Sequence, residues 1–133
     1  MATRRVHLVA VLLVCALAAY GASPVTKVTK LTDKDAGSTV TLKVADILEV
    51  NLEGNPTTGY TWELAPGGEA LLSQQGEAEF KPETKAIGSG GIVTLRFKAV
   101  QEGRMRLKLI YHRTFEPNVP PAKSFEVNLV AEK

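Results

Sequence analysis

The chain has 133 residues, of which 44% are hydrophobic and 23% are charged, with 16 Lys and Arg against 14 Asp and Glu. This composition is that of one globular domain, and it excludes a disordered chain, a collagen and a coiled coil. The single cysteine excludes a scaffold held together by disulfides.

The first 23 residues differ from the rest of the chain. Arg4 and Arg5 precede an apolar run over residues 6–19, and small residues follow within 16–21. These are the parts of a secretory signal peptide, so we predict a signal peptide over 1–23 and one domain over 24–133. The run of about 14 residues is shorter than the roughly 20 that span a bilayer, which disfavours a permanent membrane anchor. A buried N-terminal helix is the other alternative.

Removal of this segment would change the charge and the chemistry of the domain. His7 and Cys15 would be lost with it, and Arg4 and Arg5 are the only charged residues before Lys27, which leaves 14 basic against 14 acidic side chains. A balanced domain gives no reason to expect nucleic acid or a membrane as partner. We expect export to the extracellular space, the periplasm or the endosomal–lysosomal route.

Few catalytic arrangements remain in the mature domain. With His112 as its one histidine and no cysteine, a Cys-His dyad, a Cys-ligated zinc site and an HExxH metal site are excluded. A Ser-His-Asp triad would depend on His112 alone, and no GxSxG elbow supports it. Glu77 and Glu79 lie two residues apart, a spacing typical of a solvated strand face rather than of paired catalytic carboxylates. We therefore expect no enzyme activity and no cofactor or metal.

The mature chain alternates apolar and polar residues with period 2, which is typical of strands with one buried face and one solvated face. Trp62 shares its parity with Tyr60 and Leu64, which places it in the core. Beyond a turn at 69–75, no helix is expected. Short alternating strands between Gly, Pro and Asn clusters predict an all-β, immunoglobulin-like antiparallel β-sandwich. We expect about eight strands, near residues 25–32, 40–44, 48–52, 60–64, 78–85, 93–99, 105–111 and 125–129.

Three connections are richer than the others. Residues 54–59 read Gly-Asn-Pro-Thr-Thr-Gly, residues 86–91 read Ala-Ile-Gly-Ser-Gly-Gly, and residues 113–122 carry three prolines. If successive strands run antiparallel, all three connections lie at the same end of the sandwich. The glycines leave main chain open to an extended partner, and Arg113 close to Phe115 offers residue types that are common at binding hot spots.

The three connections carry three motifs in order: Asn55-Pro56-Thr57-Thr58-Gly59-Tyr60-x-Trp62, then Gly88-Ser89-Gly90-Gly91, then Arg113-Thr114-Phe115. They resemble the loop motifs of the chagasin family of cysteine-peptidase inhibitors. The first two motifs match fully. The third motif of the family, Arg-Pro-Trp, matches only at Arg113. The motif residues from Asn55 to Tyr60, from Gly88 to Gly91 and from Arg113 to Phe115 are therefore the expected peptidase-binding residues.

The resemblance implies reversible, non-covalent inhibition of papain-like, cathepsin-type cysteine peptidases by three loops that fill the active-site cleft. It places Thr57 and Thr58 over the catalytic dyad, the loop of Gly88 to Gly91 on the non-primed side, and Arg113 with Phe115 on the primed side. The expected partner is thus a peptidase, and the inhibitor is expected to be a monomer. The alternative is a secreted adhesion or carbohydrate-binding module, which would need an exposed aromatic platform.

Overall fold

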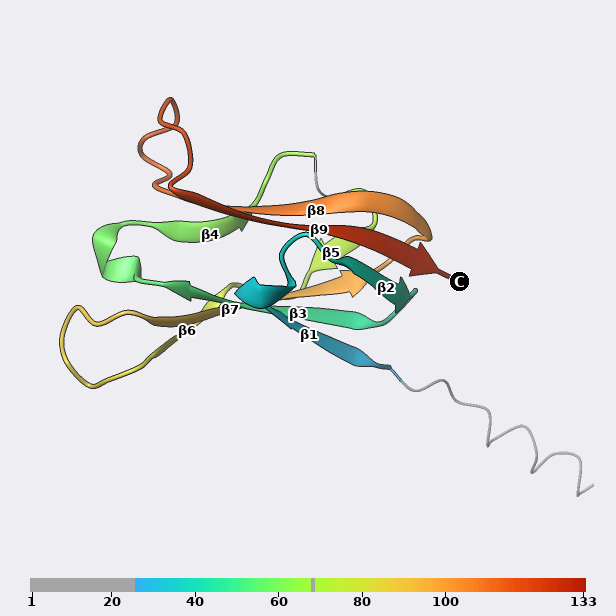
Figure 1. The fold of residues 1–133 in the computed structure, drawn as a ribbon, viewed down its shortest axis with the longest axis horizontal. Helices are drawn as coiled ribbons and strands as arrows, with labels where there is room; N and C mark the ends of the chain where they lie inside the picture. Colours follow the sequence, from blue (N-terminus) through green and yellow to red (C-terminus); the bar gives the residue numbers. More distant parts are fainter. Residues whose placement is uncertain (1–25, 68) are drawn as a thin grey trace, which may run out of the picture.

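The computed structural model describes residues 26–67 and 69–133. Within them, nine strands form two sheets that pack face to face (Figure 1). The strands are β1 (Val28–Thr32), β2 (Thr39–Lys43), β3 (Ile47–Gly54), β4 (Thr61–Leu64), β5 (Leu72–Gln74), β6 (Glu79–Pro82), β7 (Gly91–Ala99), β8 (Gly103–His112) and β9 (Lys123–Glu132). The first sheet has the order β1-β3-β7-β5, with β6 also paired to β7, and the second has the order β2-β9-β8-β4. The predicted all-β, immunoglobulin-like sandwich is confirmed.

The structure has one strand more than the eight predicted. This additional strand is β5, which lies where the sequence predicted only a turn at 69–75. Leu72 at its start is buried, and the strand pairs with the end of β7. β5 and β6 are both antiparallel to β7, so they run in the same direction along one edge of the sheet. They behave as one edge strand that is interrupted around Gly76, which has a φ of 75°. The extra strand therefore leaves the predicted direction of every later strand unchanged.

Two strand pairings differ from the predicted antiparallel arrangement. β1 pairs with β3 in parallel and β2 pairs with β9 in parallel, whereas the other five pairings are antiparallel. The cause is a change of sheet early in the chain. After β1, the single-turn 3-10 helix η2 (Asp33–Asp35) leads into β2, which belongs to the other sheet. β1 and β3 can then share a direction, because β2 makes the crossover between them.

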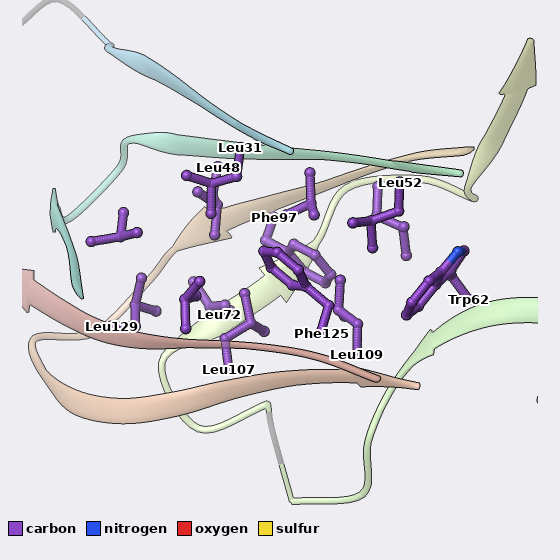
Figure 2. Packing of buried hydrophobic residues seen from close by; sticks show 14 of the residues in the cluster. Leu31, Leu48, Leu52, Trp62, Leu72, Phe97, Leu107, Leu109, Phe125 and Leu129 are labelled. Atoms are coloured by element: carbon purple, nitrogen blue, oxygen red, sulfur yellow. The ribbon is translucent and has the colours of Figure 1, made fainter. Parts of the chain in front are cut away.

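The core lies between the two sheets and follows the predicted alternation (Figure 2). Leu48, Val50 and Leu52 of β3 point inward and are fully buried, while the residues between them are half-buried on the outer face. Trp62 is buried in the same core, as its parity predicted. The large buried side chains come from both sheets and include Phe97, Leu95, Leu107, Leu109, Phe125 and Leu129. With no cysteine among the described residues, this apolar burial is the main source of stability.

An ion pair joins two strands on the outer face of the first sheet. Glu49 accepts hydrogen bonds from Asn51 Nδ2 at 3.3 Å and from Arg96 Nε at 3.1 Å. The Asn51 hydrogen bond is the main cause that lowers the pKa of Glu49 below its ordinary value of 4.5; partial burial opposes it, and the Arg96 hydrogen bond adds to it. The ionised form of Glu49 is therefore stabilised in the folded protein.

Candidate functional site

Three loops meet at one end of the sandwich, at the left in Figure 1. They are residues 55–60 between β3 and β4, 83–90 between β6 and β7, and 113–122 between β8 and β9; together we call them the three-loop surface. Two hydrogen bonds connect them: Asn55 Nδ2 donates to the Gly88 carbonyl at 2.9 Å, and Arg113 Nε donates to the Thr58 carbonyl at 3.1 Å. The structure thus brings the three predicted segments together.

The first loop is a compact turn that its own side chains hold in place. Its centre is one turn of 3-10 helix, η3 (Pro56–Thr58), with Asn55 as N-cap. Asn55 Oδ1 accepts hydrogen bonds from the Thr57 amide at 3.1 Å and from the Thr57 hydroxyl, and the Thr58 hydroxyl donates to the Asn55 carbonyl at 2.6 Å. Pro56 fixes φ at the first helical position. The loop therefore presents two exposed threonines on a shape that is set before any partner binds.

Gly59 ends this turn, and glycine is required there for two reasons. Its φ of 85° lies in the left-handed region, and a Cβ at this position would lie 3.1 Å from a ring carbon of Phe115. The first and third loops are therefore in close contact at Gly59. A side chain at this position would strain the turn and push Phe115 away.

The second loop differs in part from the open main chain that its glycines predicted. Gly91 is buried as the first residue of β7 and is paired with Gly54 on one side and Pro82 on the other. A Cβ on Gly91 would lie 2.1 Å from the Lys81 carbonyl oxygen, which leaves no room for any side chain. Gly91 therefore allows close strand packing. Gly88 is exposed, whereas Ser89 and Gly90 are half-buried.

Arg113 of the third loop makes contacts with other residues of the same chain. The guanidinium lies 4.5 Å from the centre of the Tyr60 ring and 5.9 Å from that of Phe115, and Nη1 donates to Glu116 at 3.1 Å. Together with the bond to the Thr58 carbonyl, these contacts leave its side chain 35% exposed. Arg113 therefore positions the first loop against the third, a role that its sequence context did not predict.

Thr114 and Phe115 are the exposed motif residues of the third loop. Both residues are exposed, and Phe115 retains 68% of its accessible surface. An apolar ring that is held beside Gly59 but open to solvent is suited to contact with a partner. Its intrachain contacts do not cover it.

An aromatic stack lies beneath the first loop. The Tyr111 ring lies 5.1 Å from Tyr60 and 5.1 Å from Trp62, between centroids. Its hydroxyl accepts a hydrogen bond from the Asn55 amide at 2.8 Å, and Trp62 Nε1 donates to the Glu53 carbonyl at 2.9 Å. Sequence reasoning did not include Tyr111 in the site. The available signal was its inward parity two residues before Arg113.

The polar side chains that the sequence singled out, His112 in β8 and Glu79 in β6, lie in different sheets. His112 contacts Glu63 at 2.9 Å on the side of β8 opposite to Tyr111, and Glu79 pairs with Arg96 on the outer face of the first sheet. Across residues 26–67 and 69–133, no group of three His, Cys, Asp or Glu could hold a metal ion. The chemistry that the surface offers is contact: exposed hydroxyls, main chain and one aromatic ring.

Comparison with known proteins gives a consistent result. The model of the chagasin family peptidase inhibitors matches residues 41–129. The chain is 28% identical to chagasin of Trypanosoma cruzi over 107 residues, which cover 77% of this chain and 96% of the relative. It is 30% identical to amoebiasin-1 of Entamoeba histolytica over 88 residues, which cover 66% and 85%.

The fold comparison agrees with the sequence comparison. The crystal structure of the cysteine protease inhibitor EhICP2 from Entamoeba histolytica superposes with a TM-score of 0.69 at 26% identity, covering 83% of this chain and all of the other. The structure of Leishmania mexicana ICP gives a TM-score of 0.54 at 28% identity, covering 83% and 96%. The similarity in both comparisons extends over most of the described domain.

Proposed function

The chain belongs to the chagasin family of peptidase inhibitors, and we propose that it inhibits papain-like cysteine peptidases reversibly by seating the three-loop surface in the catalytic cleft. Members of this family are inhibitors and not enzymes, so the chain acts by binding. The observation that carries the assignment of the surface is the pair of hydrogen bonds that join the loops, from Asn55 to Gly88 and from Arg113 to Thr58. They fix the relative positions of three segments before binding, which reduces the entropy lost on docking.

The first loop explains how the inhibitor escapes cleavage. A strand-like substrate binds in an extended form, whereas residues 56–58 form a 3-10 turn with its own capping hydrogen bonds. Thr57 and Thr58 would then lie over the catalytic dyad without presenting a peptide bond in an extended register. No covalent bond forms, and inhibition is reversible.

The flanking loops would occupy the two sides of the cleft. The exposed main chain at Gly88 lies next to the first loop and would follow the non-primed side. Phe115, with 68% of its surface exposed, would cover the primed side with an apolar ring. Thr114 would accompany it, and Arg113 would hold both against the first loop. A peptidase of papain type is therefore the expected partner of an inhibitor acting as a monomer.

The experiment is a titration of purified inhibitor against papain and against a cathepsin L-type peptidase. We expect stoichiometric loss of activity that recovers on dilution, because binding is non-covalent. A variant with Thr57→Arg and Thr58→Arg should inhibit at least tenfold less, since it places two bulky cations where the loop enters the cleft. Full residual activity at micromolar inhibitor would contradict the proposal.

A matched control separates the site from the fold. Thr39 and Thr41 are exposed on the outer face of β2, far from the loops in Figure 1. A variant with Thr39→Arg and Thr41→Arg adds the same charge and should inhibit like the wild type. Equal inhibition by both double variants would remove the first loop from the site.

The alternative of an adhesion or carbohydrate-binding module has little support in the described residues. Trp62 is buried, and Phe115 is the one exposed aromatic side chain in residues 26–67 and 69–133. A single exposed ring does not form a platform.

Residues 1–23 lie outside the described residues, and their role as a cleaved signal peptide remains part of the proposal. It is supported by Arg4 and Arg5 ahead of the apolar run over 6–19. No helix of the described residues is long and apolar enough to cross a membrane. Mass spectrometry of the exported protein should find an N-terminus near residue 24, and recovery of only the intact chain from the cytoplasm would contradict export.

A further inference from the structure

We propose that Glu116, a residue outside the three motifs, is a positioning residue: its carboxylate orients Arg113, and through it the exposed ring of Phe115, before a peptidase binds. The inference rests on the proposed function. Glu116 acts on binding through Arg113 and not by a contact of its own with the peptidase.

Residues 113–116 form a turn whose two ends are joined twice. The Glu116 amide donates to the Arg113 carbonyl at 3.0 Å, which makes Thr114 and Phe115 the two central residues of a β-turn. The side chains of the same two end residues also meet, with Arg113 Nη1 3.1 Å from Glu116 Oε1. Neither central residue is a proline, so neither fixes φ by itself. The ion pair between the ends therefore adds order that the backbone of this turn lacks.

Two hydrogen bonds in different directions set the orientation of the Arg113 guanidinium. Nε donates to the Thr58 carbonyl at 3.1 Å, and Nη1 donates to Glu116 at 3.1 Å. Because the guanidinium is planar and rigid, one hydrogen bond lets the plane rotate about that bond, whereas two hold it in place. The plane then lies over the Tyr60 ring, 4.5 Å from its centre, which keeps the third loop against the first.

Glu116 is also the one carboxylate in an ion pair with Arg113 across residues 26–67 and 69–133. The Thr58 carbonyl and the rings of Tyr60 and Phe115, which also contact the guanidinium, carry no charge. A cation that is partly removed from water needs a countercharge, or it favours conformations that return it to solvent. Without the Glu116 carboxylate, Arg113 would therefore leave its place between the first and third loops more often.

Phe115 depends on this arrangement because it lies between the two joined ends of the turn. Its ring lies beside Gly59, and the Arg113 guanidinium is 5.9 Å from the ring centre. Most of the ring is exposed, so these few contacts hold it. A partner that buries an exposed ring binds more tightly when the ring is already in place, since less freedom is lost on docking. Loss of Glu116 should therefore weaken binding even though Phe115 itself is unchanged.

The alternative is a direct contact between Glu116 and the peptidase, because about a third of this side chain is exposed. Two measurements separate the alternatives. One is made on the inhibitor alone, where a peptidase makes no contribution. The other compares the effect of removing Glu116 with Arg113 present and with Arg113 absent, because a residue that acts through another loses its effect when the other is removed.

The first measurement is the exchange of the Arg113 Nε proton with water, followed by heteronuclear NMR of the inhibitor alone. Glu116→Ala removes the carboxylate and keeps the backbone hydrogen bond of the turn, whereas Glu116→Gln keeps an acceptor oxygen for Nη1. Glu102→Ala is the charge-matched control, since Glu102 is exposed in the turn between β7 and β8 at the opposite end of the sandwich (Figure 1). Exchange should accelerate at least about threefold in Glu116→Ala, less in Glu116→Gln, and not at all in Glu102→Ala.

The second measurement is the inhibition constant against papain. Glu116→Ala should raise it by about three- to tenfold, the range of one hydrogen bond in a partly exposed pair, and Glu116→Gln should recover part of that loss. When Arg113→Ala is already present, adding Glu116→Ala should change the constant by less than about twofold. Glu102→Ala should inhibit like the wild type. Thermal midpoints of all variants show whether each one is folded.

The outcomes distinguish this inference from the function it rests on. An unchanged exchange rate in Glu116→Ala overturns the positioning role, whatever the inhibition constants are. An equal effect of Glu116→Ala with and without Arg113 overturns it as well, because Glu116 would then contact the peptidase directly. A wild type that does not inhibit papain overturns the proposed function and, with it, any role of Glu116 in inhibition.

Discussion

Asn55 combines two tasks that a single substitution can separate. Its Oδ1 caps the first loop by accepting from the Thr57 amide, and its Nδ2 ties that loop to the second by donating to the Gly88 carbonyl at 2.9 Å. Asn55→Asp keeps the acceptor and replaces the donor with a second oxygen. Asn55→Ala removes both. The difference between Asp and wild type therefore tests the link between the loops, and the difference between Ala and wild type tests the link and the cap together.

The magnitudes follow from the kind of hydrogen bond that is lost. A single neutral hydrogen bond contributes about 1 kcal/mol net, and the oxygen that faces the Gly88 carbonyl in the Asp variant adds a repulsion that water partly screens. We expect Asn55→Asp to weaken inhibition by about 1–2 kcal/mol, or roughly five- to thirtyfold. Asn55→Ala has no such repulsion but also loses the N-cap, which costs about 1 kcal/mol. It should therefore weaken inhibition by about 2 kcal/mol, or roughly thirtyfold.

The assay is the inhibition constant against papain, measured beside thermal denaturation of each variant. Asn128→Asp, on the exposed outer face of β9, is the charge-matched control and should leave the inhibition constant unchanged. The reasoning would be refuted if Asn55→Asp inhibited like the wild type, because the link between the loops would then be dispensable. An Asn55→Ala variant that inhibited like the wild type would refute the contribution of the link and of the cap.

Two further predictions concern stability. Gly91→Ala should lower the free energy of unfolding by about 3 kcal/mol, because its Cβ would meet the Lys81 carbonyl oxygen at 2.1 Å, whereas Gly90→Ala meets only ordinary contacts and should cost less than half as much; equal denaturant midpoints would contradict this. Because the pKa of Glu49 is lowered on folding, its contribution is present above the unfolded value near 4.5 and is lost as the pH falls below it. Glu49→Gln should therefore flatten the fall in stability below pH 4.5, and an unchanged acid limb of the unfolding curve would contradict a lowered pKa of Glu49 in the folded protein.

The predictable part of the fold is the part that local pattern determines. Leu48, Val50 and Leu52 alternate with half-buried polar residues, and the structure buries that parity. Trp62 follows the same rule and lies in the core. The loops could be assigned to one end because strand direction alternates along the chain, and the interrupted edge formed by β5 and β6 keeps that alternation.

The unpredicted parts depend on which segments meet in space. The parallel pairing of β1 with β3 arises because β2 belongs to the other sheet, and nothing in the sequence of β1 itself specifies this. β5 has three residues with one of them buried, too short for a periodic signal. The contact of Arg113 with Thr58 joins residues 55 positions apart, so a motif can identify Arg113 as part of the site without showing that it acts inside the chain.

Buried side chains of the core hold the three-loop surface in a fixed conformation. The Tyr111 ring is buried between Tyr60 and Trp62, and its hydroxyl accepts a hydrogen bond from the Asn55 amide. The side chain of Asn55 in turn donates to the Gly88 carbonyl. The position of the first loop is thus set by a residue whose ring the partner has no means to contact. Binding strength at such a surface depends on how little order remains to be gained on docking. It follows that the affinity of this inhibitor is determined partly beneath its contact surface, in side chains that a list of interface residues would leave out.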